Sequence, residues 1–113
     1  MRTITLGISS RESSNRRFLR AFEGEPQGTF VSFDSPALLF KVLTGKRWEL
    51  LKLMTGAGPM TIREAARRSG RDVKAIHADV QALLSTGILQ KTEKGRIDFP
   101  FDAVHVDFTL KAA

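Results

Sequence analysis

Residues 71–89 read RDVKAIHADVQALLSTGIL, a pattern that predicts an amphipathic helix ending near a glycine and leading into a strand. One side of this helix carries an apolar stripe of the kind that packs on a core, made of Val73, Ile76, Val80, Leu83 and Leu84. The opposite face carries small or polar side chains: Lys74, Ala75, Ala78, Gln81, Ala82 and Ser85. Such a helix needs a neighbour for its stripe and leaves its other face for solvent or a ligand.

The segments on either side of this helix supply that neighbour. Upstream, TIREAARRSG (residues 61–70) predicts a short helix that begins with a capping box between Thr61 and Glu64 and ends at Gly70. Asp72 is the expected cap of the longer helix. Downstream, ILQKTEKGRIDFPF (residues 88–101) predicts two short strands joined around a turn at EKG.

The remainder of the chain predicts further strands and helices. TITLGIS (residues 3–9) and VHVDFTL (residues 104–110) alternate as half-buried strands, with Val104, Val106, Phe108 and Leu110 expected to face inward. Residues 9–25 predict a short surface helix with a face of Phe18, Leu19 and Phe22. Ser35 can cap a helix that starts at Pro36 and has an apolar face of Leu38, Leu39, Val42 and Leu43. A further helix carries Trp48, Leu51 and Met54 at helical spacing.

The positive charge of the chain is concentrated in its centre. The net charge is +6, and residues 46–96 contain eleven Lys or Arg against five Asp or Glu. The rest of the chain is neutral. A basic segment of this kind is typical of a nucleic-acid contact surface, and the alternative is a solvated surface kept for solubility.

Composition excludes several other classes. With 113 residues, 42% hydrophobic and 27% charged, the chain is expected to be globular, with no membrane span or secretion signal. The absence of cysteine favours the cytoplasm. Two distant histidines, His77 and His105, no tyrosine and no phosphate-binding loop predict neither an enzyme nor a cofactor or metal site.

The order of helix, short helix, tight turn, longer helix and hairpin across residues 46–99 resembles a winged helix-turn-helix. The resemblance is strongest in MTIREAARRSGRDVKAIHADVQALLSTGILQK (residues 60–91), which is similar to MarR-like and related prokaryotic regulators. The whole chain, including SFDSPALLFKVLTGKRWELL and FPFDAVHVDFTLKAA, looks like small predicted transcriptional regulators often encoded beside a toxin-like gene. This resemblance implies an α+β protein that binds double-stranded DNA, with an antitoxin-like role and a cognate toxin-like partner.

In a winged helix-turn-helix the second helix of the pair enters the major groove, and the first helix and the wing hold phosphates. The resemblance therefore implies a recognition helix at about 72–86 and a wing at about 88–99. The candidate DNA-binding residues are Thr61, Arg63, Arg67, Arg71, Lys74, Ala75, His77, Ala78, Gln81, Lys91, Lys94 and Arg96. Ala75 and Ala78 would let the helix backbone approach the groove floor. Asp79 would repel DNA, so we expect it to turn toward the arginines Arg63, Arg67 and Arg68.

These patterns divide the chain into three segments. Residues 1–45 form an N-terminal strand and helix extension, residues 46–99 form the DNA-binding domain, and residues 100–113 add a strand that packs on the extension or on a partner subunit. The two terminal strands can complete a sheet within one subunit or pair across two, and a two-fold dimer suits a helix-turn-helix protein. The alternative function is a protein-interaction module whose basic face binds an acidic protein instead of DNA.

Overall fold

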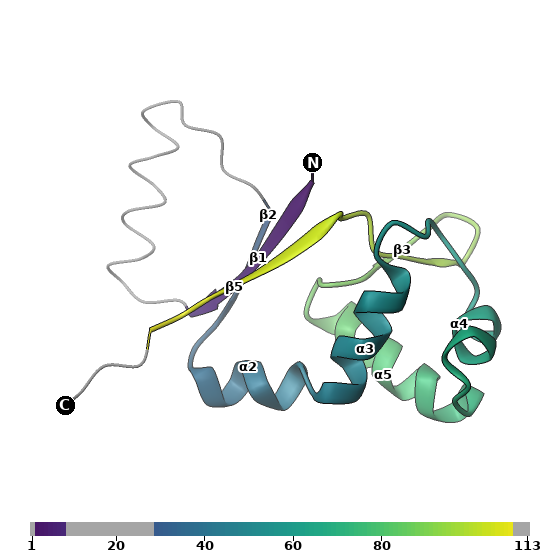
Figure 1. The fold of residues 1–113 in the computed structure, drawn as a ribbon, viewed down its shortest axis with the longest axis horizontal. Helices are drawn as coiled ribbons and strands as arrows, with labels where there is room; N and C mark the ends of the chain where they lie inside the picture. Colours follow the sequence, from purple (N-terminus) through teal and green to yellow (C-terminus); the bar gives the residue numbers. More distant parts are fainter. Residues whose placement is uncertain (1, 9–28, 110–113) are drawn as a thin grey trace.

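A computed structural model describes residues 2–8 and 29–109 of the chain, and these residues form an α+β fold (Figure 1). A parallel sheet contains β1 (Thr3–Ile8), β2 (Thr29–Phe33) and β5 (Ala103–Asp107), in the order β2-β1-β5. The strand near the end of the chain thus pairs with the strand near its beginning inside one subunit. Of the two arrangements that the sequence left open, the structure has the first.

One face of this sheet packs against helices. The register places Ile4 beside Val104 and Leu6 beside both Val31 and Val106. Ile4 and Leu6 are fully buried in the core, and the three valines pack against it. On the opposite face of β1, Gly7 lies under the ring of Phe30. The alternation predicted for both terminal strands is therefore confirmed over Thr3–Ile8 and Ala103–Asp107.

Two helices connect the sheet to the central segment. α2 (Pro36–Val42) begins where the Ser35 hydroxyl accepts a hydrogen bond from the Leu38 amide, as the Ser-Pro pair predicts. α3 (Gly45–Met54) begins in the same way, because the Thr44 hydroxyl accepts from the Arg47 amide.

The predicted pair of helices and hairpin follow in order. α4 (Ile62–Ser69) and α5 (Val73–Ser85) are separated by three residues, and β3 (Gln90–Lys91) pairs antiparallel with β4 (Ile97–Asp98). Met60 adds a bridge to Ile97, which ties the start of α4 to the hairpin. None of the helices in the described part of the chain is long and apolar enough to cross a membrane.

A single apolar core joins the three segments. It contains Ile4 and Leu6 from β1, Leu50, Leu51 and Met54 from α3, Ile76, Val80 and Leu83 from α5, and Phe99 and Phe101 from the end of the chain. Three side chains expected in the apolar stripes are instead exposed: Leu38 (43%), Trp48 (36%) and Val73 (44%). All three side chains lie in the first turn of their helices, where the apolar stripe extends beyond the core.

Some expectations fall outside the described residues. The surface helix with Phe18, Leu19 and Phe22, and the inward position of Leu110, belong to residues 9–28 and 110–113. Phe108 is described, and it is 36% exposed, so the expectation that it faces inward is not met.

Candidate nucleic-acid interface

The turn between α4 and α5 is fixed by a glycine. Gly70 has φ 69° and ψ 21°, a left-handed conformation that favours glycine over other residues. The Gly70 amide donates to the Arg67 carbonyl and the Arg71 amide donates to the Ala66 carbonyl. This pattern satisfies the last carbonyls of α4 and lets α5 begin after only three residues. The predicted helix end at Gly70 is confirmed.

The starts of the two helices match the sequence only in part. The Thr61 hydroxyl accepts a hydrogen bond from the Glu64 amide at 3.1 Å, as predicted. The Glu64 carboxylate does not complete a capping box, because it pairs with Arg68 at 2.9 Å and Arg67 at 3.5 Å. Asp72 stands at the N-cap position of α5, but its side chain makes no capping hydrogen bond.

The solvent side of α5 is a continuous stripe. Its exposed members Lys74, His77, Ala78, Gln81 and Ser85 recur at helical spacing, while Ile76, Val80 and Leu83 are buried behind them. His77 lies within this stripe. Ala75 and Ala82 are half-buried at its borders, so the expectation that Ala75 is fully open to a ligand is not met. The stripe is therefore polar, with the small side chain of Ala78 at its middle.

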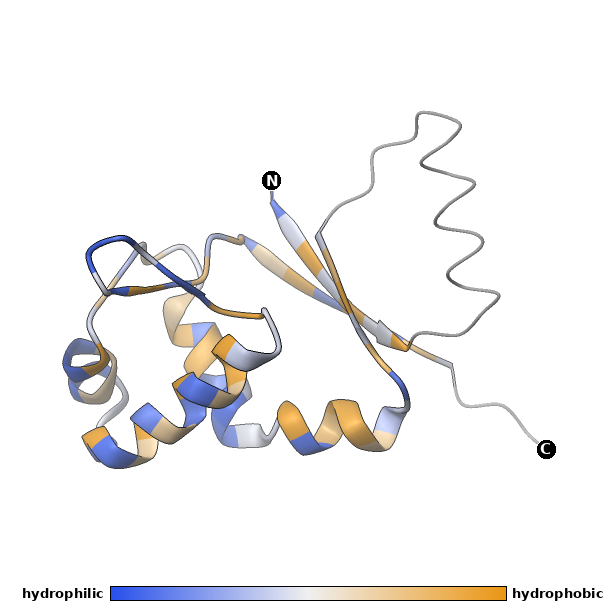
Figure 2. Ribbon diagram, turned by 180° about the vertical axis from the view of Figure 1, so that it is seen from behind, coloured by the Kyte–Doolittle hydropathy of each residue, from blue (hydrophilic) through white to orange (hydrophobic). Residues whose placement is uncertain are grey.

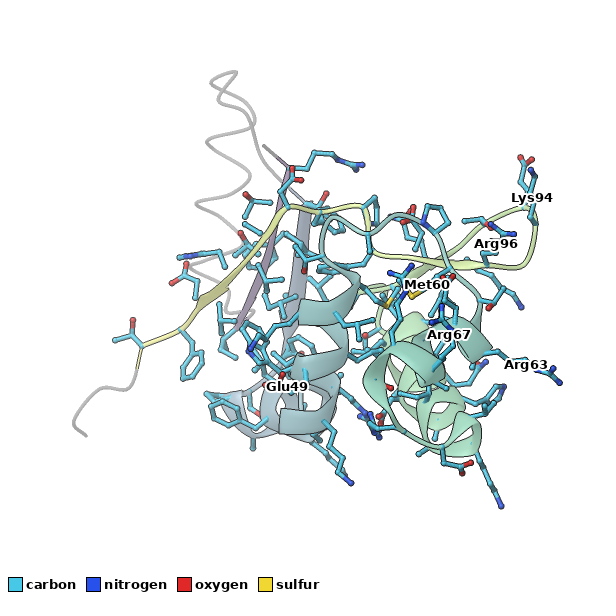
Figure 3. All side chains as sticks on the ribbon, turned by 45° about the vertical axis from the view of Figure 1, so that its right-hand side comes forward. Glu49, Met60, Arg63, Arg67, Lys94 and Arg96 are labelled. Carbon is cyan, nitrogen blue, oxygen red and sulfur yellow. The ribbon has the colours of Figure 1, made fainter. Side chains whose placement is uncertain are left out.

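α4 and the hairpin carry further exposed cations. Arg63, Lys91, Lys94 and Arg96 are exposed, and none of them pairs with an acidic side chain among the described residues. Figure 3 shows Arg63, Lys94 and Arg96 directed outward on the side away from the parallel sheet. Figure 2 shows the hairpin and α4 as mainly hydrophilic, whereas α2 is mainly hydrophobic.

The hairpin that carries three of these cations is held in shape at its tip. The Thr92 amide donates to the Arg96 carbonyl at 2.8 Å, and the Arg96 amide donates to the Thr92 hydroxyl at 3.1 Å. Gly95 has φ 79°, which permits the tight return predicted at EKG. Lys91, Lys94 and Arg96 are therefore displayed on a defined turn.

Asp79 does not turn toward the arginines of α4, and this expectation was wrong. Its Oδ1 accepts a hydrogen bond from Arg47 Nε at 3.0 Å, and its Oδ2 lies 2.8 Å from Arg71 Nη2. The second contact is an ion pair without an aligned hydrogen bond, since Oδ2 has no hydrogen-bond partner. Arg47 also donates from Nη1 to the Val42 carbonyl at 2.9 Å. These contacts fasten the middle of α5 to α3 and to the turn before α5.

This network also fixes the position of the candidate Arg71. Arg71 is only 24% exposed in its side chain and faces Asp79, so it lies beside the stripe of α5 and not within it. Sequence analysis missed Arg47 altogether. The sequence signal for such a partner was Asp79 itself, which lies three residues after Ile76 and one before Val80. A carboxylate within a buried apolar stripe requires a cationic partner, because burying an unpaired charge is costly.

The HVO_A0114 family model matches residues 42–106 of the chain, from the last residue of α2 into β5. No curated protein and no solved structure shows a significant match to the chain. The matched segment contains α3, α4, α5, the hairpin and the Asp79 network, and it spans more than half of the 113 residues. The chain therefore belongs to the HVO_A0114 family.

Proposed function

We propose that this protein is a sequence-specific DNA-binding transcriptional regulator in which residues 46–99 form a winged helix-turn-helix. α5 is the recognition helix, α4 is the helix that precedes it, and the β3–β4 hairpin is the wing. The observation that carries this proposal is the exposed stripe of Lys74, His77, Ala78 and Gln81 on α5. Arg63 on α4 and the hairpin cations, which have no acidic partner in the described part of the chain, add positive charge to the same domain. Such a surface suits a helix in the major groove between two phosphate contacts.

The side chains divide by chemistry into two groups. Gln81 and Lys74 can make hydrogen bonds to base edges, since glutamine suits adenine and lysine suits guanine, and the Ala78 methyl can contact a thymine methyl. Arg63 and Arg67 on α4 and the cations of the hairpin are placed to contact phosphates, which position a protein on DNA without reading sequence. The Thr61 hydroxyl accepts its capping bond and keeps its own hydrogen for a phosphate oxygen.

The resemblance to regulators encoded beside toxin-like genes suggests control of the protein's own promoter. A footprint on the DNA upstream of its own gene is the expected result. A two-fold dimer that reads a pseudo-palindrome is part of this proposal, and a toxin-like protein is a further candidate partner.

Salt dependence tests whether the basic face binds DNA. We expect the affinity for a short random-sequence duplex to fall steeply with salt, and Lys94→Ala or Arg63→Ala to reduce the slope of log affinity against log salt by about one unit. Lys41→Ala is the matched control, because Lys41 is exposed on α2, away from α4, α5 and the hairpin. If the protein binds no duplex at low salt, the proposal fails, and the basic face is then assigned to an acidic protein.

A further inference from the structure

The largest exposed apolar side chains gather away from the basic surface. Phe40 on α2 is 57% exposed, Trp48 on α3 is 36% exposed, and Phe108 just after β5 is 36% exposed. The rings of Phe40 and Phe108 pack edge to face at 5.5 Å. Figure 2 shows the hydrophobic colour of α2 on the side of the molecule remote from the hairpin. A contiguous exposed apolar patch of this kind marks an interaction surface.

This patch borders an open strand edge. β5 is an outer strand of the parallel sheet, with β1 on one side and no strand on the other among residues 2–8 and 29–109. An outer strand presents backbone N–H and C=O groups that another chain can pair with. Phe108 directly follows β5, whereas none of the exposed large apolar side chains of the described residues lies on or directly beside β2 in the sequence. The edge of β5 is therefore the better site for a partner.

A cavity lies beside the beginning of this strand. It has a volume of about 150 Å³ and is lined by Trp48, Leu51, Thr55 and Val104, with Lys52, Asp102 and Ala103 completing its wall. An apolar cavity of about this volume can hold a benzene ring. Trp48 and Val104 connect the cavity to the patch, because Val104, Val106 and Phe108 follow one another at every second position of the chain.

We propose that a second copy of this chain docks here through its own β5, antiparallel to the first, with the two-fold axis at Val106. In that register Val104 lies opposite Phe108 of the second copy, on the face that packs against the helices. His105 lies opposite Asp107 of the second copy on the other face. Directly opposed side chains of antiparallel strands approach to about 5 Å, so Phe108 of each copy enters the cavity of the other.

Charge selects this register over its neighbours. With the two-fold axis at Val106, the imidazole N–H of His105 in each copy faces the Asp107 carboxylate of the other copy, once on each side of the axis. Moving the axis to His105 opposes the two histidines and places Asp107 opposite Ala103, so both favourable pairs are lost. The proposal concerns the free protein and does not depend on DNA binding.

Sedimentation of the full chain without DNA tests the interface. We expect a dimer at micromolar concentration, and Phe108→Ala or Asp107→Lys should raise its dissociation constant about tenfold or more. The double variant His105→Glu, Asp107→Lys should restore most of the affinity, since it places a carboxylate opposite an ammonium group in each pair. Ser32→Lys on β2 is the control, because it introduces the same lysine side chain at an exposed position on the opposite edge and should leave the dimer intact.

Disulfide cross-linking tests the register independently, since the chain has no cysteine of its own. Val106→Cys places two thiols at the axis, where strand spacing suits a disulfide, and should give a cross-linked dimer on oxidation. His105→Cys and Val104→Cys should not cross-link. Circular dichroism confirms that each variant is folded. A monomer at every concentration, or a dimer insensitive to Phe108→Ala and Asp107→Lys, would overturn the proposal whatever the outcome with DNA.

Discussion

Asp79 on α5 accepts a hydrogen bond from Arg47 on α3 at 3.0 Å, across 32 positions of sequence. The Asp79 side chain is only 12% exposed, and Arg71 lies on its other side. One carboxylate thus pairs with two arginines and holds the candidate recognition helix against the rest of the fold. Removing it leaves two partly buried cations without a counter-charge.

We therefore expect Asp79→Ala to lower the free energy of unfolding by about 3 kcal/mol, the low end for breaking a buried ion pair. The value is at the low end because Arg47 and Arg71 keep 21% and 24% of their side-chain surface exposed. Urea unfolding measures the loss. The control is Arg68→Ala, which breaks a pair of similar length (2.9 Å) at the surface and should cost less than about 1 kcal/mol. Equal losses in the two variants would contradict this account of Asp79.

The two helix starts give a second prediction. Thr61→Ala removes a hydroxyl that accepts from the Glu64 amide and should cost about 1 kcal/mol, at low and high salt alike. Asp72 makes no capping hydrogen bond, so Asp72→Ala should remove only its interaction with the helix dipole. That smaller loss should fade in high salt. Thermal unfolding at two salt concentrations separates the cases, and a salt-independent loss of about 1 kcal/mol at Asp72 would show that its side chain caps α5.

Gly7 is the position where the sheet has no room for a side chain. A Cβ atom added there would lie 2.8 Å from Phe30 Cζ and 3.0 Å from the Asp107 carbonyl oxygen. Gly7→Ala should therefore destabilise the protein by about 1 to 3 kcal/mol through overpacking. Gly45, the first residue of α3, has no atom within 4 Å of such a Cβ, so Gly45→Ala should stabilise by about 0.5 kcal/mol. The same sign for both variants in chemical unfolding would be inconsistent with this packing.

The sequence was informative about individual elements because their signals are local. The Ser35 cap, the Gly70 turn and the EKG hairpin each depend on a few neighbouring residues, and all three are confirmed. The partners of elements were not predictable in this way. Alternation identified β1 and β5 as strands, but it does not indicate which strands pair or in which direction. Their parallel pairing depends on the path that the chain takes between them. Arg47 and Asp79 meet only after α3 and α5 have packed.

Periodicity also predicts which face of a helix a side chain occupies, but it does not predict how far along the helix the core extends. Val73 shares the stripe of Ile76 and Val80, yet it is 44% exposed because it is the first residue of α5 and lies at the margin of the core, which Ile76 already joins. The same limit explains Ala75, which the sequence placed on the open face and the structure places at its border.

The most direct test of the proposed function is Ala78→Glu. Ala78 is exposed in the middle of the α5 stripe, so a carboxylate there would meet the phosphates and base edges of the groove without disturbing the core. The measurement is affinity for a duplex that the unaltered protein selects from a random pool, with Ser32→Glu on β2 as the control for added charge. We predict that Ala78→Glu lowers this affinity at least about a hundredfold while the unfolding temperature stays the same, and that Ser32→Glu keeps full affinity. Full affinity of the Ala78→Glu variant would contradict the assignment of α5 as the recognition helix.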